Sequence, residues 1–504
     1  MRFLQHKHFL KRISAIALGA LVPFAFAPYN LYFISIFSLS IIFYFWSTTS
    51  SARECFIIGY LFGFAMFGVG VNWLHISINL FGGVNLIGAL LLTYIFIAYI
   101  SLFPALCGYL AARFFKHFRI ITLPSLWLLT EWCRGWMLTG FPWLNIGSSQ
   151  TDSILAGFAP VLGDYGITFF VCLSAMAISI LITGNTKRRI ISGLLLILLI
   201  VSSSLLKNIN WTNDINKDID IVLVQGAIPQ EQKWKPEQRQ NTYEIYSNLS
   251  KPFWSSDLII WPETAIPSLY HLADDFIIPI SNEQLSSNAM FMSGLAYKES
   301  ESNDYFNSIL LVDNEHRFYH KNHLVPFGEY LPFKSFLGEI LRFLKIPMSD
   351  FSSGDPDQKT FETDKGVFGM SICYEDAYGS EVRKALPDAN ILINVSNDAW
   401  FGDSFAPHQH LQMARMRALE NGRYLLRSTN TGISAVIDNK GNIISRSPQF
   451  KPHALPATVK LYSGQTPYSK FGNSLILSLC ILGLFLSFII NRKLKTSIKN
   501  HQTV

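Results

Sequence analysis

Long apolar runs dominate the first part of the chain, and one more occurs close to its end. A helix needs roughly 17–25 mostly apolar residues to cross about 30 Å of hydrocarbon. The runs here reach that length, and they predict about eight membrane-spanning helices. These helices are expected near residues 13–28, 31–48, 56–78, 86–112, 121–140, 160–184, 190–206 and 472–490.

The first run also resembles a secretory signal peptide, because Lys11 and Arg12 precede it and Ala25-Phe26-Ala27 ends it. Pro28 would directly follow a cut at that point, and further apolar runs come at once. We therefore interpret the segment as the first membrane span.

Between the seventh and eighth runs the pattern changes. From 210 to 470 the apolar residues occur in short runs broken by Asn, Asp, Gly and Pro, which predicts one water-soluble domain. Strand-sized runs alternate there with helix-like stretches, as in an α/β domain. The chain thus divides into a membrane domain over 1–209, a soluble domain over 210–470, and a last span with its tail over 471–504. The strand-sized runs are 219–225, 258–263, 289–296, 308–313, 367–373 and 391–398.

Composition and charge agree with a membrane protein. Half of the 504 residues are hydrophobic, and only 15% are charged. Lys and Arg fall in loops on one side of the predicted spans, whereas the opposite short loops, such as 77–84 and 140–150, carry almost none. The positive-inside rule then predicts cytoplasmic termini and an external soluble domain, and the net charge of +6 requires no nucleic-acid partner. The loop cations are Arg2, Lys7, Lys11, Arg12, Arg53, Arg113, Lys116, Arg119, Lys187, Arg188, Arg189, Arg492, Lys493, Lys495 and Lys499.

Cys373 is the only cysteine in the predicted soluble domain, so it cannot form a disulfide within that domain. A free cysteine is usually a small buried hydrophobe, and that alternative stays open from the residues alone. The position of Cys373, at the end of an apolar run and directly before Tyr374 and Glu375, also suits a reactive thiol. The remaining cysteines lie in or beside apolar runs, at positions 55, 107, 133, 172 and 480.

Two further segments place ionisable side chains at strand ends. Glu263 closes the run "IIWPE", where partial desolvation would suit a general base, although a lone Glu is more often a solvated surface residue. The histidines and cysteines of the domain lack the spacing of a zinc site, so we expect no metal. The segment "YHKNHLVPFGEYLP", 319–332, supplies four ionisable residues around a turn rich in Pro and Gly: His320, Lys321, His323 and Glu329.

Glu263, Lys321 and Cys373, in this order, resemble the Glu-Lys-Cys domain of the carbon–nitrogen hydrolase (nitrilase) superfamily. The segments "NVSNDAWFG" and "RALENGRYLLRSTNTGIS" follow as in that superfamily. From residue 13 to 490 the chain resembles its membrane-embedded branch, the apolipoprotein N-acyltransferases of Gram-negative bacteria. The motifs "TEWCRGWMLTGFPWLNIG" and "VQGAIPQEQKW" carry this part of the resemblance. It implies an α-β-β-α sandwich for the soluble domain, carried by a polytopic helical membrane domain.

The resemblance also implies a reaction. A fatty acyl group would move from a membrane phospholipid, through a thioester on Cys373, to the N-terminal amine of the S-diacylglyceryl-cysteine of an apolipoprotein, which is the last step of lipoprotein maturation. Glu263 would take the thiol proton, and Lys321 with the main-chain N–H of Tyr374 would stabilise the oxyanion. No cofactor is implied.

Further residues are candidates for supporting roles. Glu329 and Glu375 match accessory carboxylates of the family, which orient Lys321 or assist proton transfer. Glu131 and Arg134, three residues apart in the fifth predicted span, would pair with each other or contact a lipid head group. Three apolar side chains near the site could line the acyl entrance, although ordinary packing explains them equally well. They are Trp234, Phe327 and Leu331.

Both implied substrates are confined to a bilayer. We therefore expect a multi-pass monomer in the bacterial inner membrane, with the catalytic domain in the periplasm and both termini in the cytoplasm. Two alternatives remain. An amidase or nitrile hydrolase would use the same Glu, Lys and Cys with water, but it would not need about eight spans. A channel or receptor would give the three residues no chemical role, and its Cys373 would be unreactive toward thiol reagents.

Overall fold

The computed structural model describes residues 2–287, 289–332, 350–358 and 360–502. The chain forms two compact units. The helical unit comprises Met1–His75, Leu90–Ile209 and Phe471–Val504. The sheet unit comprises Ile76–Ala89 and Asn210–Lys470.

The helical unit consists of long apolar helices joined by short loops. α3 and α6 approach closely because α3 carries glycine at the contact: a Cβ at Gly59 would lie 2.5 Å from the carbonyl oxygen of Pro104. Ser51 begins α3, since its side chain accepts a hydrogen bond from the main-chain N–H of Glu54. The helices are α1 (Arg2–Leu21), α2 (Phe33–Thr48), α3 (Ala52–Gly70), α5 (Leu86–Ile100), α6 (Leu102–Phe114), α7 (Arg119–Arg134), α8 (Ala159–Thr183), α9 (Thr186–Lys207) and α17 (Ser474–Gln502).

Six helical segments of the described chain are long and apolar enough to cross a membrane, and each coincides with a predicted run. The second and fifth predicted runs form α2 and α7, with 16 residues each. At 1.5 Å per residue such a helix is only about 24 Å long. α7 ends at Arg134, short of the predicted end at 140, so the count of eight spans stays a prediction. The six segments are Lys7–Ala25, Ala52–Gly70, Leu86–Phe114, Ile154–Thr183, Thr186–Lys207 and Ser474–Lys493.

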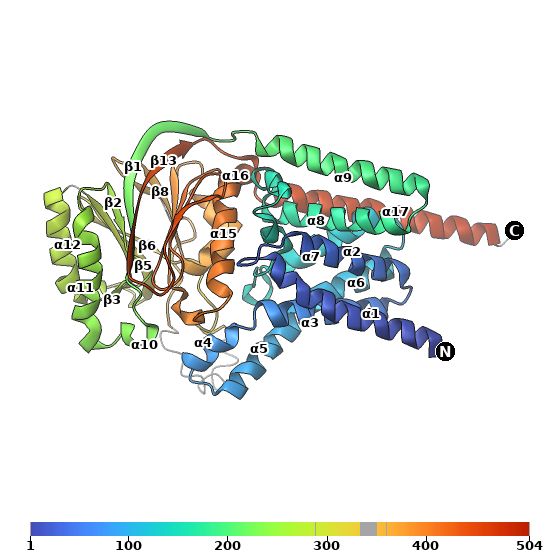
Figure 1. The fold of residues 1–504 in the computed structure, drawn as a ribbon, viewed down its shortest axis with the longest axis horizontal. Helices are drawn as coiled ribbons and strands as arrows, with labels where there is room; N and C mark the ends of the chain where they lie inside the picture. The colour runs from blue at the N-terminus through green and yellow to red at the C-terminus, as the bar shows by residue number, and fades with distance from the viewer. Residues whose placement is uncertain (1, 288, 333–349, 359, 503–504) are drawn as a thin grey trace. The chain divides into compact units, whose positions relative to one another are not determined.

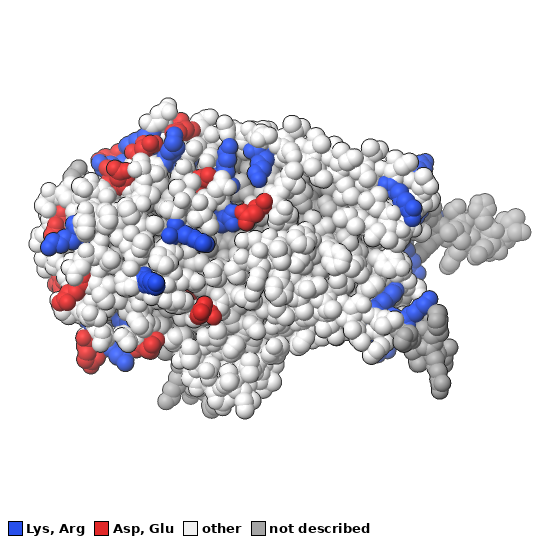
Figure 2. Space-filling view, viewed as in Figure 1, with Lys and Arg blue, Asp and Glu red and all other residues white. Residues whose placement is uncertain are grey.

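Both ends of the chain lie at the same end of the helical unit (Figure 1). On the face that Figure 2 shows, Lys and Arg side chains gather at that end, while the helix surfaces beside them are uncharged. This distribution matches the basic loops from which the orientation was predicted.

Two mixed sheets form the centre of the sheet unit. The first has the strand order β13-β1-β2-β4-β5-β6, with β3 paired to β4, and the second has the order β12-β11-β10-β9-β8-β7. The six predicted strands are all present, as β1, β2, β4, β5, β8 and β9. The first sheet contains β1 (Asn213–Gln225), β2 (Leu258–Ile260), β3 (Ile266–Leu269), β4 (Met290–Lys298), β5 (Tyr305–Val312), β6 (His316–His320) and β13 (His453–Ser463). The second contains β7 (Phe361–Glu362), β8 (Val367–Ile372), β9 (Ile391–Ser396), β10 (Leu425–Thr429), β11 (Ala435–Ile437) and β12 (Ile443–Arg446).

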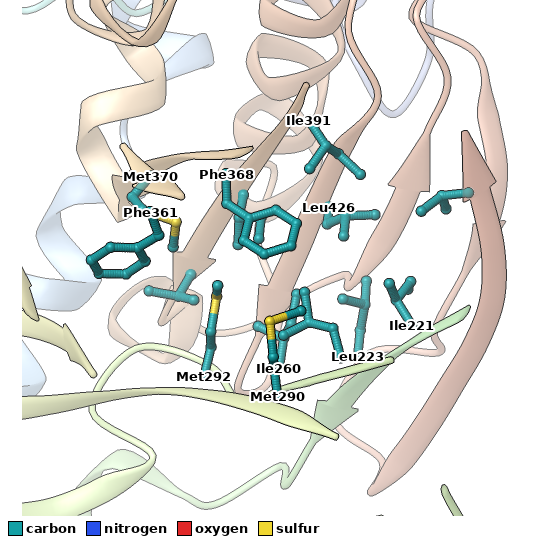
Figure 3. Packing of buried hydrophobic residues seen from close by; sticks show 14 of the residues in the cluster. Ile221, Leu223, Ile260, Met290, Met292, Phe361, Phe368, Met370, Ile391 and Leu426 are labelled. Carbon is teal, nitrogen blue, oxygen red and sulfur yellow. The ribbon is translucent and has the colours of Figure 1, made fainter. Parts of the chain in front are cut away.

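The two sheets face each other across an apolar core (Figure 3). Because successive strand residues point to opposite faces, Ile221 and Leu223 of β1 enter this core together with Phe368 of β8. Val222 and Val224 instead belong to a second apolar cluster on the outer face of the first sheet. Burial on both faces explains why these strands appear in the sequence as continuous apolar runs.

Helices cover the outer face of each sheet (Figure 1). α11 (Arg239–Ser250) and α12 (Asp274–Ser287) pack on the first sheet. α14 (Gly379–Val382) and α15 (Ala406–Asn421) pack on the second. The predicted α-β-β-α sandwich is therefore confirmed. The described chain also contains the short helices α4 (Leu74–Leu80), α10 (Gln230–Lys233) and α16 (Pro467–Phe471).

Strand direction brings the candidate residues to one edge of the sandwich. β2 runs parallel to β4, and β6 runs in the same direction as β4, because β5 is antiparallel to both. Glu263 follows β2 and Lys321 follows β6. In the second sheet, β8, β9 and β10 are parallel, and Cys373 directly follows β8.

Candidate active site

Glu263 is a buried carboxylate with one oxygen held and one oxygen free. Its Oε1 accepts a hydrogen bond of 2.7 Å from Asn307 Nδ2 and lies 3.7 Å from Lys321 Nζ. Among the described residues its Oε2 has no hydrogen-bond partner, although it is buried. An oriented carboxylate with a free lone pair is suited to accept a proton.

The turn that carries Glu263 depends on a glycine in the neighbouring strand. A Cβ at Gly294 of β4 would lie 2.4 Å from the main-chain nitrogen of Thr264 and 2.5 Å from Glu263 Cα. Gly294 also donates a main-chain hydrogen bond of 3.1 Å to Pro262. Thr264 has a left-handed conformation, with φ of 48°. Because β4 can approach so closely, it supports this unusual turn.

Lys321 is buried, and carboxylates surround its ammonium group. Its Nζ lies 2.9 Å from Glu329 Oε2 and 3.0 Å from Glu329 Oε1. Burial opposes the charge of Lys321, but the carboxylates of Glu329 and Glu263 outweigh it, so its pKa is raised. The side chain is therefore a permanent cation at neutral pH, as an oxyanion partner must be.

Asn307 of β5 connects the two carboxylates, and the sequence interpretation did not include it. Its Nδ2 donates 2.7 Å to Glu263 and 2.8 Å to Glu329. Its main-chain oxygen accepts a hydrogen bond of 2.8 Å from the Lys321 N–H. The only available signal was that Asn307 directly precedes the predicted strand-sized run 308–313, where a buried polar side chain would need partners.

Cys373 begins a short 3₁₀ turn, Cys373–Ala377, at the end of β8. Its φ of 51° places a non-glycine residue in the left-handed region, a strained conformation that is often found at functional sites. The residue as a whole is partly buried, and it packs against the apolar core between the sheets. Burial first, and Glu263 second, raise the pKa of the thiol, while Lys321 opposes them. The sulfur is thus protonated at neutral pH, and it needs a base before it can attack.

Glu375 ties the cysteine turn to the segment that follows Lys321. Its carboxylate accepts hydrogen bonds from the main-chain N–H groups of Ile372 (2.6 Å), Asn322 (2.7 Å) and His323 (3.1 Å). Burial raises the pKa of Glu375 to about 7, and these hydrogen bonds oppose the increase. Glu375 therefore positions both segments, whereas Glu329 contacts the Lys321 ammonium directly.

The other predicted residues of the sheet unit lie at the edge of this cluster. Tyr374 is buried, and its hydroxyl accepts a hydrogen bond of 3.0 Å from Tyr378. Trp234 is 38% exposed and Phe327 46% exposed, and Leu331 is partly buried. Trp234 directly follows α10, and Phe327 lies in the loop after Lys321. Exposed apolar side chains on these two segments suit an entrance for an apolar substrate.

Glu131 and Arg134 belong to the helical unit, where both are buried and have protein partners. Arg134 donates to the main-chain oxygens of Phe141 and Trp143, both at 2.6 Å. Glu131 accepts a hydrogen bond of 2.6 Å from Thr168, and the two charges lie 4.0 Å apart. These contacts stabilise the turn after α7, and a lipid contact stays a prediction.

A charged cluster beneath Cys373 was also absent from the sequence interpretation. His410 Nε2 lies 3.2 Å from the main-chain oxygen of Cys373 and 2.7 Å from Asp376 Oδ1, and its Nδ1 lies 2.8 Å from Asp398. Arg427 contacts both aspartates, at 2.8 and 3.1 Å. Burial and Arg427 lower the pKa of His410, but the two aspartates outweigh them and raise it to about 9. The resulting imidazolium shares its Nε2–H between Asp376 and the Cys373 carbonyl, and this contact supports the strained turn.

The described residues contain no group of three or more His, Cys, Asp or Glu side chains that could hold a metal ion. The site instead combines a protonated thiol, a carboxylate with a free oxygen and a permanent ammonium. This set supports nucleophilic attack by sulfur on a carbonyl carbon, with proton transfer to the carboxylate.

Known proteins resemble this chain over both units. Residues 18–177 match the family model "Apolipoprotein N-acyltransferase N-terminal domain", and residues 221–466 match "Carbon-nitrogen hydrolase". The apolipoprotein N-acyltransferase of Methylococcus capsulatus is 40% identical over 475 residues, which are 93% of this chain and 94% of the relative. That of Nitrosomonas europaea is 40% identical over 486 residues, or 95% and 96% of the two chains. A solved carbon-nitrogen hydrolase from Helicobacter pylori is 18% identical and covers 48% of this chain and 88% of its own, with a TM-score of 0.37.

Proposed function

Since this chain belongs to the family of apolipoprotein N-acyltransferases, we propose that Cys373, Glu263 and Lys321 carry out its acyl transfer. The chain is an acyltransferase of lipoprotein maturation, and it is a membrane protein. The observation that supports the three residues best is the free, buried Oε2 of Glu263 within electrostatic range of a protonated thiol.

In the first half-reaction the thiol proton of Cys373 moves to Glu263 as the sulfur attacks the ester carbonyl of a phospholipid. The C–S bond forms, and the carbonyl oxygen becomes an oxyanion between Lys321 and the main-chain N–H of Tyr374. When the oxyanion collapses, the C–O bond of the ester breaks. The departing lysophospholipid alkoxide takes the proton from Glu263, and a thioester remains on Cys373.

In the second half-reaction the N-terminal amine of a diacylglyceryl-modified lipoprotein attacks this thioester. Glu263 accepts a proton from the amine, and the tetrahedral intermediate is stabilised by the same groups. The C–S bond breaks because a thiolate leaves readily, and the proton on Glu263 returns to sulfur. The products are an amide and the free thiol.

A phospholipid donor fits a site that belongs to a membrane protein. Donor and acceptor both carry acyl chains, and removing such chains into water costs about 0.8 kcal/mol for each CH₂ group exposed. An enzyme fixed in the same bilayer, acting as a monomer, avoids this cost. Trp234, Phe327 and Leu331 would then contact the acyl chains.

The observation that decides this function is the covalent intermediate. We expect wild-type protein purified from its membrane to carry a fatty acyl mass on the Cys373 peptide, because the first half-reaction can proceed before an acceptor arrives. Mass spectrometry before and after neutral hydroxylamine should show this adduct disappear, as a thioester does. An acyl mass on a different residue of the sheet unit would overturn the assignment.

The proposed location is the bacterial inner membrane, with the sheet unit in the periplasm and both termini in the cytoplasm. This orientation is supported by the basic loops, because Lys and Arg are retained on the cytoplasmic side. It would also bring the thiol to lipoproteins that have already been exported.

The orientation predicts the labelling of Cys373 from outside. After removal of bound acyl, a membrane-impermeant maleimide added to intact spheroplasts should modify Cys373. A Lys187→Cys control in a Cys373→Ala background should be labelled only after lysis, because Lys187 lies in a predicted cytoplasmic loop. Labelling of Cys373 only after lysis would show that the orientation is wrong.

A further inference from the structure

Lys233 is a buried cation beside the candidate active site. The mechanism above gives this lysine no role. It is the last residue of α10, and its side chain is only 1% exposed. A buried ammonium is normally paired with a carboxylate, because an uncompensated charge is costly away from water. Within the described part of the chain, Lys233 forms no such ion pair. Its Nζ instead donates a hydrogen bond of 3.0 Å to the main-chain oxygen of Glu263.

The charges around Lys233 indicate what it compensates. Glu263 and Glu329 are carboxylates of 8% and 12% side-chain exposure, and Lys321 is the ammonium that lies within 4 Å of both. Two carboxylates and one ammonium leave one negative charge. A protonated Lys233 offsets this charge, and it lies within electrostatic range of both Glu263 and the Cys373 thiol.

The hydrogen bond from Lys233 also acts on the position of the base. It holds the main chain of Glu263, while Asn307 holds its Oε1. The free Oε2 is thereby directed by two contacts from separate elements, α10 and β5. The left-handed Thr264 directly after Glu263 gives this turn a strained conformation that such contacts must maintain.

We propose that Lys233 is a positioning residue for acyl transfer, which holds the Glu263 turn and supplies a second positive charge for the Cys373 thiolate and the oxyanion. The inference rests on the proposed role of Cys373 as the nucleophile. When the thiol proton moves to Glu263, the negative charge moves from carboxylate to sulfur while both ammonium groups remain. Burial lowers the pKa of Lys233 to about 7, the charge of Glu263 opposes this, and a nearby thiolate favours the protonated form.

The test separates a charge effect from a simple structural tether. Lys233→Met removes charge and hydrogen bond, Lys233→Gln removes the charge, and Lys233→Arg keeps it. Lys235→Met is the matched control, because Lys235 lies two residues further along and is exposed. In the full-length enzyme, after hydroxylamine treatment, the rate of Cys373 alkylation by iodoacetamide is measured against pH by peptide mass spectrometry. Single-turnover acylation by phospholipid vesicles is measured in parallel.

We expect the Met and Gln variants to shift the alkylation midpoint of Cys373 upward by about one pH unit. Acyl-enzyme formation at neutral pH should slow by about 10–100-fold in both. The Arg variant should stay within about threefold of wild type, since its charge is kept. Lys235→Met should match wild type in both measurements.

Two outcomes would overturn the proposal in different ways. An unchanged alkylation profile in the Met and Gln variants, with only a lower melting temperature, would mean that Lys233 is a structural tether. If Lys233→Met does not fold, the comparison of the Gln and Arg variants decides the same question. If wild-type enzyme forms no adduct on Cys373 from phospholipid, the proposed function itself fails, whatever the Lys233 variants show.

Discussion

Cys373→Ala should abolish N-acylation of lipoproteins, with a rate at least about 10⁴-fold below wild type, because the sheet unit has no other cysteine to form the thioester. The loss should appear in both half-reactions, since the variant cannot receive an acyl group from phospholipid. Mass spectrometry of a lipoprotein substrate, together with single-turnover assays in vesicles, measures both. The fold should tolerate the change, because the residue is only partly buried and alanine removes a single sulfur atom.

A matched cysteine variant and a serine variant complete this experiment. Cys133→Ala is the control, because Cys133 is also partly exposed but belongs to the helical unit. It should leave both half-reactions unchanged. Cys373→Ser should form an oxyester only slowly, since a hydroxyl is a much weaker nucleophile than a thiolate. Acyl transfer by Cys373→Ala within tenfold of wild type would exclude Cys373 as the nucleophile.

Glu263→Gln should slow acyl-enzyme formation by about 10²–10⁴-fold while it makes the Cys373 thiol easier to ionise. The amide can still accept the hydrogen bond from Asn307, so the geometry should be kept, but it cannot take a proton. The carboxylate of Glu263 raises the pKa of Cys373, and its neutralisation should therefore lower that pKa. Alkylation by iodoacetamide at neutral pH should accordingly become faster as acylation becomes slower.

Lys321→Ala should change the alkylation rate of Cys373 in the opposite direction from Glu263→Gln, while acylation slows in both variants. The Lys321 ammonium lowers the thiol pKa, so its removal should raise that pKa and slow alkylation. Acylation should also slow, by about 10²–10³-fold, because the oxyanion loses a cation.

Glu301→Gln is the control for Glu263→Gln, because Glu301 is an exposed carboxylate of the same unit. Parallel changes of alkylation and acylation in Glu263→Gln would argue against a base at this position.

Much of the fold could be predicted from the sequence, because it depends on local patterns. The long apolar runs and the short strand runs differ in length and spacing, and both types of element were located from that difference. The strands β3, β6, β7 and β10 to β13 were not predicted. β6, β12 and β13 lie at sheet edges and have more polar residues, β10 contains Arg427, Ser428 and Thr429, and β3, β7 and β11 are very short. The lengths of α2 and α7 also escaped prediction, because flanking apolar residues form turns instead of further helix.

The site could be predicted only in part. Glu263 and Cys373 could be named because each ends a strand-sized run, and Lys321 because the three residues occur in the order of a known superfamily. Asn307 and Lys233 could not be named in this way. Each is remote in sequence from Glu263. Asn307 contacts it only after β5 has paired with β4, the neighbour of β2, and Lys233 only after α10 has packed beside the Glu263 turn.

The sequence by itself determined the division into membrane helices and an α/β domain, the basic loops, and the presence of a single thiol in that domain. These three properties depend on hydropathy and residue type along the chain, and none of them requires knowledge of distant contacts. Only the tertiary structure decided the electrostatic state of the site. The thiol pKa is raised and the Lys321 cation is retained because burial removes water and strand packing brings Glu263 and Glu329 to their present distances.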